Sequence, residues 1–139
     1  MKQEFESLVV ETHGAGLYDF TKSALRFARA TAIQNGLLTC FIRHTSASLL
    51  IQENADPDVL ADLEDFMRGL VSRDPGLYRH NAEGPDDMPS HIRAALTAST
   101  LTIPVREGRA ALGTWQGLYV FEHRDAAHRR EVLLHLIGE

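Results

Sequence analysis

Residues 37–71 form the stretch LLTCFIRHTSASLLIQENADPDVLADLEDFMRGLV, and its pattern determines the fold class. Residues 37–43 are a short apolar run that predicts a strand, and residues 49–53 are a second candidate strand. Asp56 is a suitable N-cap, and Pro57 fits the first position of the helix that follows. That helix has one apolar stripe, formed by Leu60, Leu63, Met67, Leu70 and Val71. The stretch therefore combines strands and a helix in one short piece of chain.

The flanking segments extend the same mixture. A helix is predicted from Thr21 to Asn35, with Gly36 as its C-cap glycine, and a shorter helix over residues 89–98. Further strands are predicted at residues 4–12, 100–106, 109–122 and 131–137, with a turn at Glu107-Gly108 joining the middle two. Helices are concentrated in the first two thirds, with antiparallel strands elsewhere. We therefore predict a single α+β domain over residues 1–139, with largely antiparallel sheets and about three helices.

The composition excludes several classes of protein. The chain has 139 residues, of which 44% are hydrophobic and 24% charged, as in a folded globular domain. Its formal net charge of −5 and the absence of a basic stripe argue against a nucleic-acid partner. No apolar run is long enough for a membrane span or a signal peptide, so a cytoplasmic protein is expected. The single cysteine, Cys40, excludes an intrachain disulfide and is expected to be a small buried residue.

Two polar segments follow the predicted strands of the opening stretch. Strand alternation places His44 on the face of Cys40 and Ile42, where a histidine is either a hydrogen-bonded core residue or a ligand aimed into a pocket. Glu53 and Asn54 precede the helix and have no capping role, although a solvated turn explains them equally well.

A third polar segment, His80 to His91, contains two histidines and three carboxylates within twelve residues. His91 is expected in the first turn of a helix, where the helix dipole disfavours imidazolium and keeps the ring in its metal-binding neutral form. Asp86 and Asp87 could coordinate an ion or orient a histidine, and simple helix-terminus electrostatics is the structural alternative. Together with His44, these histidines predict a site for zinc or another transition ion. Magnesium alone would prefer an all-oxygen set of ligands.

The last third of the chain contains two further polar segments. Residues 113–117, GTWQG, interrupt a strand, and alternation places Thr114, Gln116 and Glu122 on one face, which indicates a cleft or, equally, a bulge or barrel-like bend. A charged cluster follows at His123, Arg124, Asp125, His128, Arg129 and Arg130. We interpret this cluster as an exposed turn, with an anion contact by Arg129 or Arg130 as the alternative.

At these residues the sequence closely resembles a known family. His44-Thr45-Ser46-Ala47 resembles its HTSA/HTTA motif, and Glu53-Asn54 with Asp56-Pro57 resembles its ENxDP stretch. The segments Tyr78-x-His80-Asn81 and Asp86-Asp87-Met88-Pro89-x-His91 are similar to its YxHN and DDMPxH motifs. Residues 113–117 with Glu122, and Arg129-Arg130-x-Val132, resemble its GTWQG...E and RRxV signatures. These motifs, in order over nearly the whole chain, are those of the YjbQ or secondary thiamine-phosphate synthase family. Ala98 stands where a glycine is expected, which affects only a turn.

The resemblance implies a homotrimeric α+β protein with a histidine-lined metal site at His44, His80 and His91. It also implies a weak thiamine-phosphate synthase activity, in which a hydroxymethylpyrimidine diphosphate and a thiazole phosphate are joined with loss of pyrophosphate. Positive charge for that leaving group is expected from the metal and from arginines such as Arg43, Arg79, Arg129 and Arg130. The ion is expected to be divalent, either zinc or another transition ion, with magnesium an alternative for a diphosphate substrate.

The residues and the resemblance together give a leading hypothesis of a metal-dependent enzyme that acts on small phosphorylated substrates. We assign catalysis to Glu53, Asp87 and Gln116, and substrate binding to Thr45, Ser46, Asn54, Thr114 and Arg129. A non-catalytic trimeric module that binds a metal or a metabolite is the rival interpretation. The third interpretation is that the histidines have a purely structural role, which is the role we assign to His13 and His135.

Overall fold

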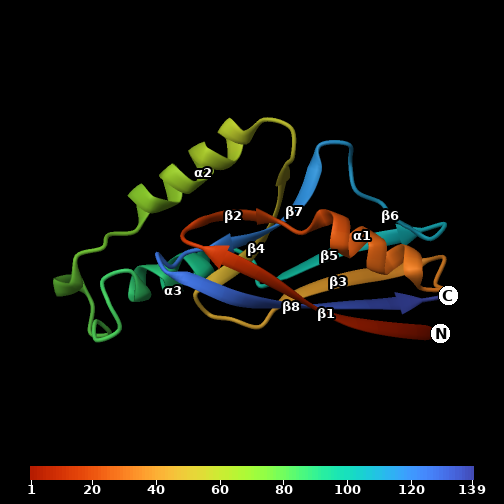
Figure 1. The fold of residues 1–139 in the computed structure, drawn as a ribbon, viewed down its shortest axis with the longest axis horizontal. Helices are drawn as coiled ribbons and strands as arrows, with labels where there is room; N and C mark the ends of the chain where they lie inside the picture. The colour runs from red at the N-terminus through yellow and green to blue at the C-terminus, as the bar shows by residue number, and fades with distance from the viewer.

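A computed structural model describes residues 1–139 as two antiparallel sheets with three α-helices (Figure 1). The strands are β1 (Lys2–His13), β2 (Gly16–Asp19), β3 (Gly36–Ile42), β4 (Ala47–Glu53), β5 (Thr100–Arg106), β6 (Arg109–Ala110), β7 (Gln116–Glu122) and β8 (Ala127–Gly138). The helices are α1 (Thr21–Ala30), α2 (Pro57–Leu70) and α3 (Asp87–Leu96), and a short 3-10 helix, η1 (Pro75–Leu77), lies between the last two. The predicted α+β class, the antiparallel pairing and the number of helices are confirmed.

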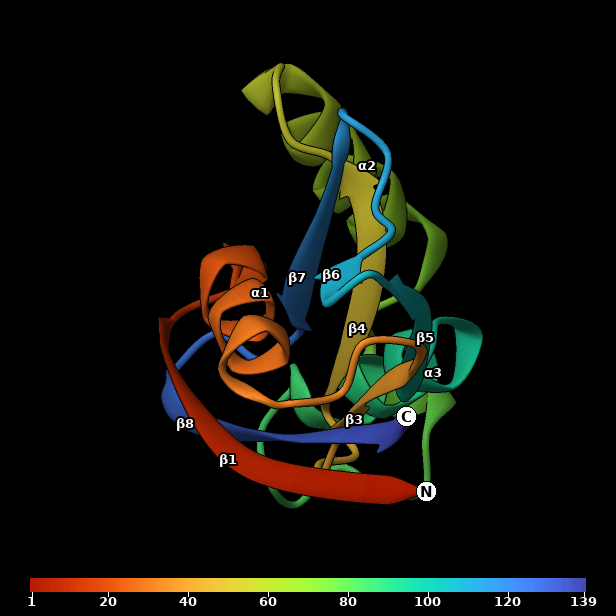
Figure 2. The same cartoon turned by 90° about the vertical axis from the view of Figure 1, so that its right-hand side faces the viewer.

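The strands are divided between a five-stranded sheet, in the order β1-β8-β3-β5-β6, and a three-stranded sheet, in the order β2-β7-β4. Figure 2 shows the strands of the smaller sheet running across those of the larger one, with α1 beside both. Helix α2 extends away from the sheets and contains no fully buried residue (Figure 1). No helix is long and apolar enough to cross a membrane.

The core lies between α1 and the facing sides of the two sheets. Strand alternation brings inward residues such as Leu38 and Cys40 of β3 against Leu134 of β8, and Leu118 and Val120 of β7 complete the packing. Cys40 is fully buried, and its burial raises the pKa of the thiol to about 12. The prediction of a small buried cysteine is therefore confirmed.

The predicted helix over Thr21–Asn35 is too long, because α1 ends at Ala30. The Thr31 hydroxyl donates to the Ala28 carbonyl at 3.0 Å and accepts from the Ile33 N–H at 3.3 Å, which turns the chain out of the helix. Gly36 is not a C-cap glycine but the first residue of β3. A Cβ atom there would lie 2.1 Å from the Ile137 carbonyl oxygen, so glycine is required by the close approach of β8.

The prediction of one long strand over residues 109–122 is also wrong. The turn at Glu107-Gly108 is present, but β6 ends after two residues, and β7 belongs to the other sheet. Pro104 of β5 accepts from the Ala111 N–H at 2.8 Å but has no N–H to donate in return, so the ladder stops there. The chain then crosses to the smaller sheet, where β7 pairs with β4 and with β2, a strand that was not predicted.

A buried ion pair joins the two sheets. The Arg130 guanidinium of β8 donates to both carboxylate oxygens of Glu122 of β7, from Nε at 2.8 Å and from Nη2 at 2.5 Å. The Thr12 hydroxyl donates to Glu122 at 2.6 Å, and Arg130 also donates to the Ser46 hydroxyl at 3.0 Å. Glu122 and Arg130 are 0% and 3% exposed. The interpretation of Arg130 as part of an exposed turn is therefore wrong.

Replacing Arg130 by Met is expected to lower the free energy of unfolding by about 3–5 kcal/mol, because Glu122 would remain buried without a counter-charge. Urea denaturation measures the loss. The matched control is Arg129→Met on the same strand, where Arg129 pairs with Glu11 and both side chains are mostly exposed. That change is expected to cost about 1 kcal/mol or less. Equal losses in the two variants would contradict the structural role given to the buried pair.

Candidate functional site

Three side chains of the predicted polar loop converge at the start of α3. Asp87 and His91 are four residues apart and so share one face of the helix, and His80 approaches from the preceding loop. The Asp87 Oδ2 atom is 2.6 Å from His80 Nε2 and 3.1 Å from His91 Nε2. One ligand atom from each residue lies within 4.8 Å of the other two. The structure therefore brings together two of the three predicted histidine ligands with a carboxylate.

The tautomer of His91 is determined by its other ring nitrogen. His91 Nδ1 lies 2.9 Å from the Thr45 carbonyl oxygen, which can only accept, so Nδ1 has the proton in the neutral ring. His91 Nε2 then directs a lone pair at the Asp87 carboxylate. Two acceptors at this distance repel unless a proton or a cation lies between them. The donor set of two imidazole nitrogens and one carboxylate oxygen fits a transition ion such as zinc.

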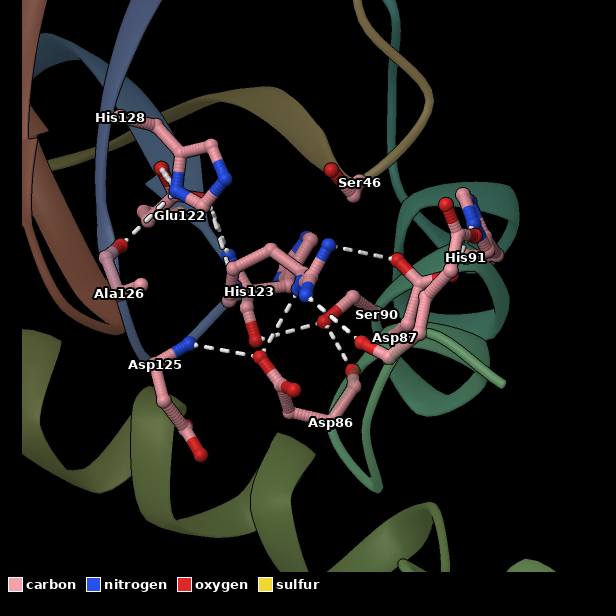
Figure 3. Close-up of polar contacts among 12 residues, drawn as sticks. Ser46, Asp86, Asp87, Ser90, His91, Glu122, His123, Asp125, Ala126 and His128 are labelled. Carbon is pink, nitrogen blue, oxygen red and sulfur yellow. Dashed lines mark hydrogen bonds and ion pairs between the residues drawn. The ribbon is translucent and has the colours of Figure 1, made fainter. Parts of the chain in front are cut away.

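Arg124 holds the two aspartates of this segment in place. Its Nη1 atom donates to Asp87 Oδ1 at 2.7 Å and its Nε atom to Asp86 Oδ2 at 2.8 Å, which leaves Asp87 Oδ2 directed at the histidines. Figure 3 shows Asp86, Asp87 and Ser90 at the start of α3, facing the end of β7. The interpretation of Arg124 as part of an exposed turn is therefore wrong, because this side chain orients the cluster.

The cluster favours a bound positive charge. Burial alone would favour the neutral acid of Asp87, but the hydrogen bond with His80 and the Arg124 charge hold the pKa of Asp87 below its ordinary value. The same hydrogen bond is the main cause that raises the pKa of His80. The carboxylate is thus ionised at neutral pH, and the imidazoles that face it attract either a proton or a metal ion.

His44 lies outside the cluster. Its Nε2 atom accepts from the Glu131 N–H at 2.8 Å, and its Nδ1 atom lies 3.4 Å from the Arg130 guanidinium. Partial burial and the Arg130 charge lower the pKa of His44, so the ring is neutral. With Thr45, Ser48 and His91, His44 lines a pocket of about 280 Å³ next to the cluster. The structure thus places His44 and Thr45 beside the candidate metal site, and Ser46 behind them against Arg130.

A third histidine near this pocket, His123, was not among the predicted site residues. It is 1% exposed, its Nε2 atom is 2.9 Å from the Ser48 hydroxyl, and its carbonyl accepts from Ser90 at 2.8 Å. Burial lowers the pKa of His123 to about 4. Continuing the alternation of β7 beyond Glu122 would have placed His123 on the buried face of Tyr119 and Phe121. The interpretation of this residue as part of an exposed turn is therefore wrong.

All but one of the remaining predicted site residues lie at the opposite end of the smaller sheet. β4 runs from Ala47, beside the pocket, to Glu53, which is paired with Gln116 of β7. Six strand residues span roughly 20 Å. Asn54 and Thr114 are at this far end, where Asn54 Nδ2 donates to the Thr114 carbonyl at 3.4 Å. Arg129 is elsewhere again, exposed beside Glu11 on the larger sheet.

The fold and the cluster define a class of small α+β protein with a histidine–carboxylate site at a helix start. Within that class, the chain belongs to the YjbQ family, because the family model described as "UPF0047 protein YjbQ-like" matches residues 6–139. The resemblance inferred from the motifs is confirmed.

Individual relatives cover the chain almost completely. A UPF0047 protein of Synechocystis is 51% identical over 138 residues, which span 99% of this chain and 94% of that protein. The UPF0047 protein YjbQ of Escherichia coli O157:H7 is 39% identical over 96% of this chain and 97% of that protein. A solved structure from Aeropyrum pernix has a TM-score of 0.87 at 30% identity, and the match covers 98% of this chain and 99% of that one. A YbjQ-like protein of unknown function from Sulfolobus solfataricus, with a TM-score of 0.89 at 24% identity and 99% coverage of both chains, shares the fold.

The burial of neutral His123 gives a prediction for acid stability. Because the pKa is 6.5 in the unfolded chain and about 4 in the folded one, only the unfolded state binds this proton between those values. This contribution to stability is complete above pH 6.5 and is lost as the pH falls towards 4, with a slope of up to roughly 1.4 kcal/mol per pH unit. Urea denaturation across this range should show a smaller slope for His123→Gln than for the wild type. Parallel slopes would contradict the assignment.

Proposed function

We propose that the protein is a metal-dependent enzyme that acts on small phosphorylated substrates, with a divalent transition ion, such as zinc, held by His80, Asp87 and His91. The main support is geometric: His91 turns Nδ1 to the Thr45 carbonyl and Nε2 to the Asp87 Oδ2 atom at 3.1 Å, and His80 Nε2 faces the same oxygen at 2.6 Å. This ligand set differs from the set of three histidines that the resemblance implies, because Asp87 takes the place of His44. His44 lies instead in the wall of the adjoining pocket, where a substrate would contact it.

The protein's own residues have separate roles in this proposal. Thr45 fixes the His91 tautomer through its carbonyl, and Arg124 directs Asp87 Oδ2 towards the histidines. A bound divalent ion supplies positive charge that stabilises a phosphate or diphosphate leaving group. Arg124 is engaged with Asp86, Asp87 and the Glu83 carbonyl, so it positions the site and does not itself bind the substrate.

The candidate reaction is the synthesis of thiamine phosphate. In it, the thiazole nitrogen forms a bond to the methylene carbon of the pyrimidine, while the bond from that carbon to the diphosphate oxygen breaks and pyrophosphate leaves. This choice rests on the resemblance to the YjbQ family. The pocket of about 280 Å³ beside His91 is of a size that accommodates part of such a substrate.

We also propose that three copies of the chain assemble through the outer face of the five-stranded sheet. Phe5, Val9, Leu37 and Phe41 point away from the core and are 43–58% exposed. Phe5 stacks on His135 with ring centroids 4.3 Å apart, so this face presents an ordered aromatic surface. Exposed apolar patches of this kind commonly mark contacts between proteins, and the homotrimer expected from the resemblance provides identical copies as partners.

The metal proposal is tested by titrating metal-free protein with zinc in a calorimeter. His80→Ala and His91→Ala should each weaken binding by more than the roughly 10- to 100-fold loss typical of residues that only orient a ligand. Arg124→Gln should fall within that range. His44→Ala and His13→Ala should bind zinc as the wild type does, since both residues lie outside the cluster.

Turnover separates the enzyme from the rival module. Release of pyrophosphate from the pyrimidine diphosphate and thiazole phosphate is expected with the zinc-loaded wild type, and loss of that release is expected with His91→Ala. Zinc binding and saturable substrate binding without turnover on any phosphate ester tested would instead favour the non-catalytic module. Zinc binding that depends on His44 but not on His80 would show that the proposed ligand set is wrong.

The assembly is tested by replacing both Phe5 and Phe41 with Glu. Charges on the apolar sheet face are expected to convert the trimer to a monomer, because burying an unpaired carboxylate in an interface is unfavourable. Light scattering after size-exclusion chromatography measures the mass. Phe66→Glu is the control, since Phe66 is 65% exposed but lies on α2. Dissociation of the Phe66 variant alone would place the interface on α2 instead.

A further inference from the structure

The far end of the smaller sheet contains a second pocket, of about 250 Å³. It lies between α1, β6 and the segment that leads into β7. Its polar lining residues include Arg29, Asn54, Arg109, Thr114 and Gln116. Three of these belong to motifs that the sequence analysis assigned to the site, yet they are roughly 20 Å of strand away from His91.

Arg29 and Arg109 are the two charged residues that line this pocket. Neither forms an ion pair or a side-chain hydrogen bond. By contrast, three of the four arginines proposed from sequence to stabilise a leaving group are already neutralised. Arg43 pairs with Glu131, Arg129 with Glu11 and Arg130 with Glu122. In a chain with a formal net charge of −5, two unpaired guanidinium groups in one pocket indicate an anion as their partner.

The other polar groups of the pocket are available as donors. Gln116 Oε1 accepts from the Gly113 N–H at 2.7 Å, which leaves the side-chain NH₂ of Gln116 without a partner. The Thr114 hydroxyl also has no partner within the chain, and no carboxylate lines the pocket. Donors without a competing carboxylate suit phosphate oxygens.

A carboxylate does lie beside the pocket. Glu53 is directly opposite Gln116 in the β4–β7 ladder and therefore shares its face. Its Oε2 atom is buried and has no hydrogen-bond partner within the chain. A buried acceptor without a donor is costly, so a bound N–H group would stabilise it. The exposed indole of Trp115, next in the chain to Gln116, offers a stacking surface for a ring.

We infer that this pocket binds the phosphate or diphosphate group of a small nitrogen-containing ring compound, with Arg29 and Arg109 contacting the anion and Glu53 accepting from an N–H group of the ring. The choice of ring rests on the proposed function, whose substrate is a pyrimidine diphosphate; a derivative with an N–H group on the ring would engage Glu53 as well as the arginines. Anion binding itself rests only on the pocket and does not require the metal cluster.

Calorimetric titration of metal-free protein with inorganic pyrophosphate tests the anion contact. Arg29→Gln/Arg109→Gln is expected to weaken binding about tenfold or more, because it removes two charge-assisted contacts. The matched control is Arg68→Gln/Arg73→Gln, which makes the same change in net charge at exposed residues outside the pocket, at the far end of α2 and just beyond it. That control should bind within about twofold of the wild type, because its charges are distant and screened. Circular dichroism verifies that both variants are folded.

Binding by the His91 variant separates this inference from the metal proposal. His91→Ala should bind pyrophosphate as the wild type does, even though it is expected to lose zinc. Pyrophosphate binding that is lost in His91→Ala but kept in Arg29→Gln/Arg109→Gln would overturn the inference, as would wild-type protein without saturable binding at millimolar pyrophosphate. Equal weakening in the two arginine double variants would also overturn it, since the effect would then be one of net charge.

Discussion

The buried pair of Glu122 and Arg130 is the interaction on which both the fold and the candidate site depend. It joins the two sheets, because Glu122 ends β7 and Arg130 belongs to β8. Both charges are removed from water, which is unfavourable unless each is fully hydrogen-bonded. Thr12 and Ser46 supply the additional bonds from β1 and from the loop before β4. The pair therefore fixes how four separate segments meet.

The same pair also determines where the functional side chains lie. Glu122 Oε2 accepts from the backbone N–H groups of His123 and Arg124, at 3.1 and 3.3 Å, and so sets the direction in which the chain leaves β7. From that position Arg124 reaches Asp86 and Asp87 at the start of α3. The Glu122 carboxylate of β7 therefore determines, through Arg124, how Asp87 is oriented towards His80 and His91. This explains why polar residues remain in an otherwise apolar region between the sheets.

The sequence predicted the features that depend on local pattern. The apolar runs predicted the strands β3 and β8, and Asp56 with Pro57 marked the start of α2, where the Asp56 side chain accepts from the Asp58 N–H. The prediction from sequence failed where contacts with a distant segment of the chain determine the local structure. Gly36 looked like a helix cap, although its real constraint is the carbonyl of Ile137, a hundred residues later in the chain. His123 and Arg124 looked like an exposed turn, because their partners lie on β4 and α3.

The candidate site shows the same division between local and distant information. The sequence placed His91 in the first turn of a helix and Asp87 in the loop just before it, and both contribute to the cluster. The sequence could not show that His44 lies outside the cluster. Its Nε2 atom accepts from the Glu131 N–H of β8, a strand far away in the sequence. Nor could the sequence show that Glu53 and Gln116 lie at the other end of the smaller sheet. β4 and β7 are paired along seven residues, so no hinge within one chain can bring these two ends together. Reacting atoms must approach to about 3–3.5 Å, so if both ends serve one reaction, they belong to different copies of the chain.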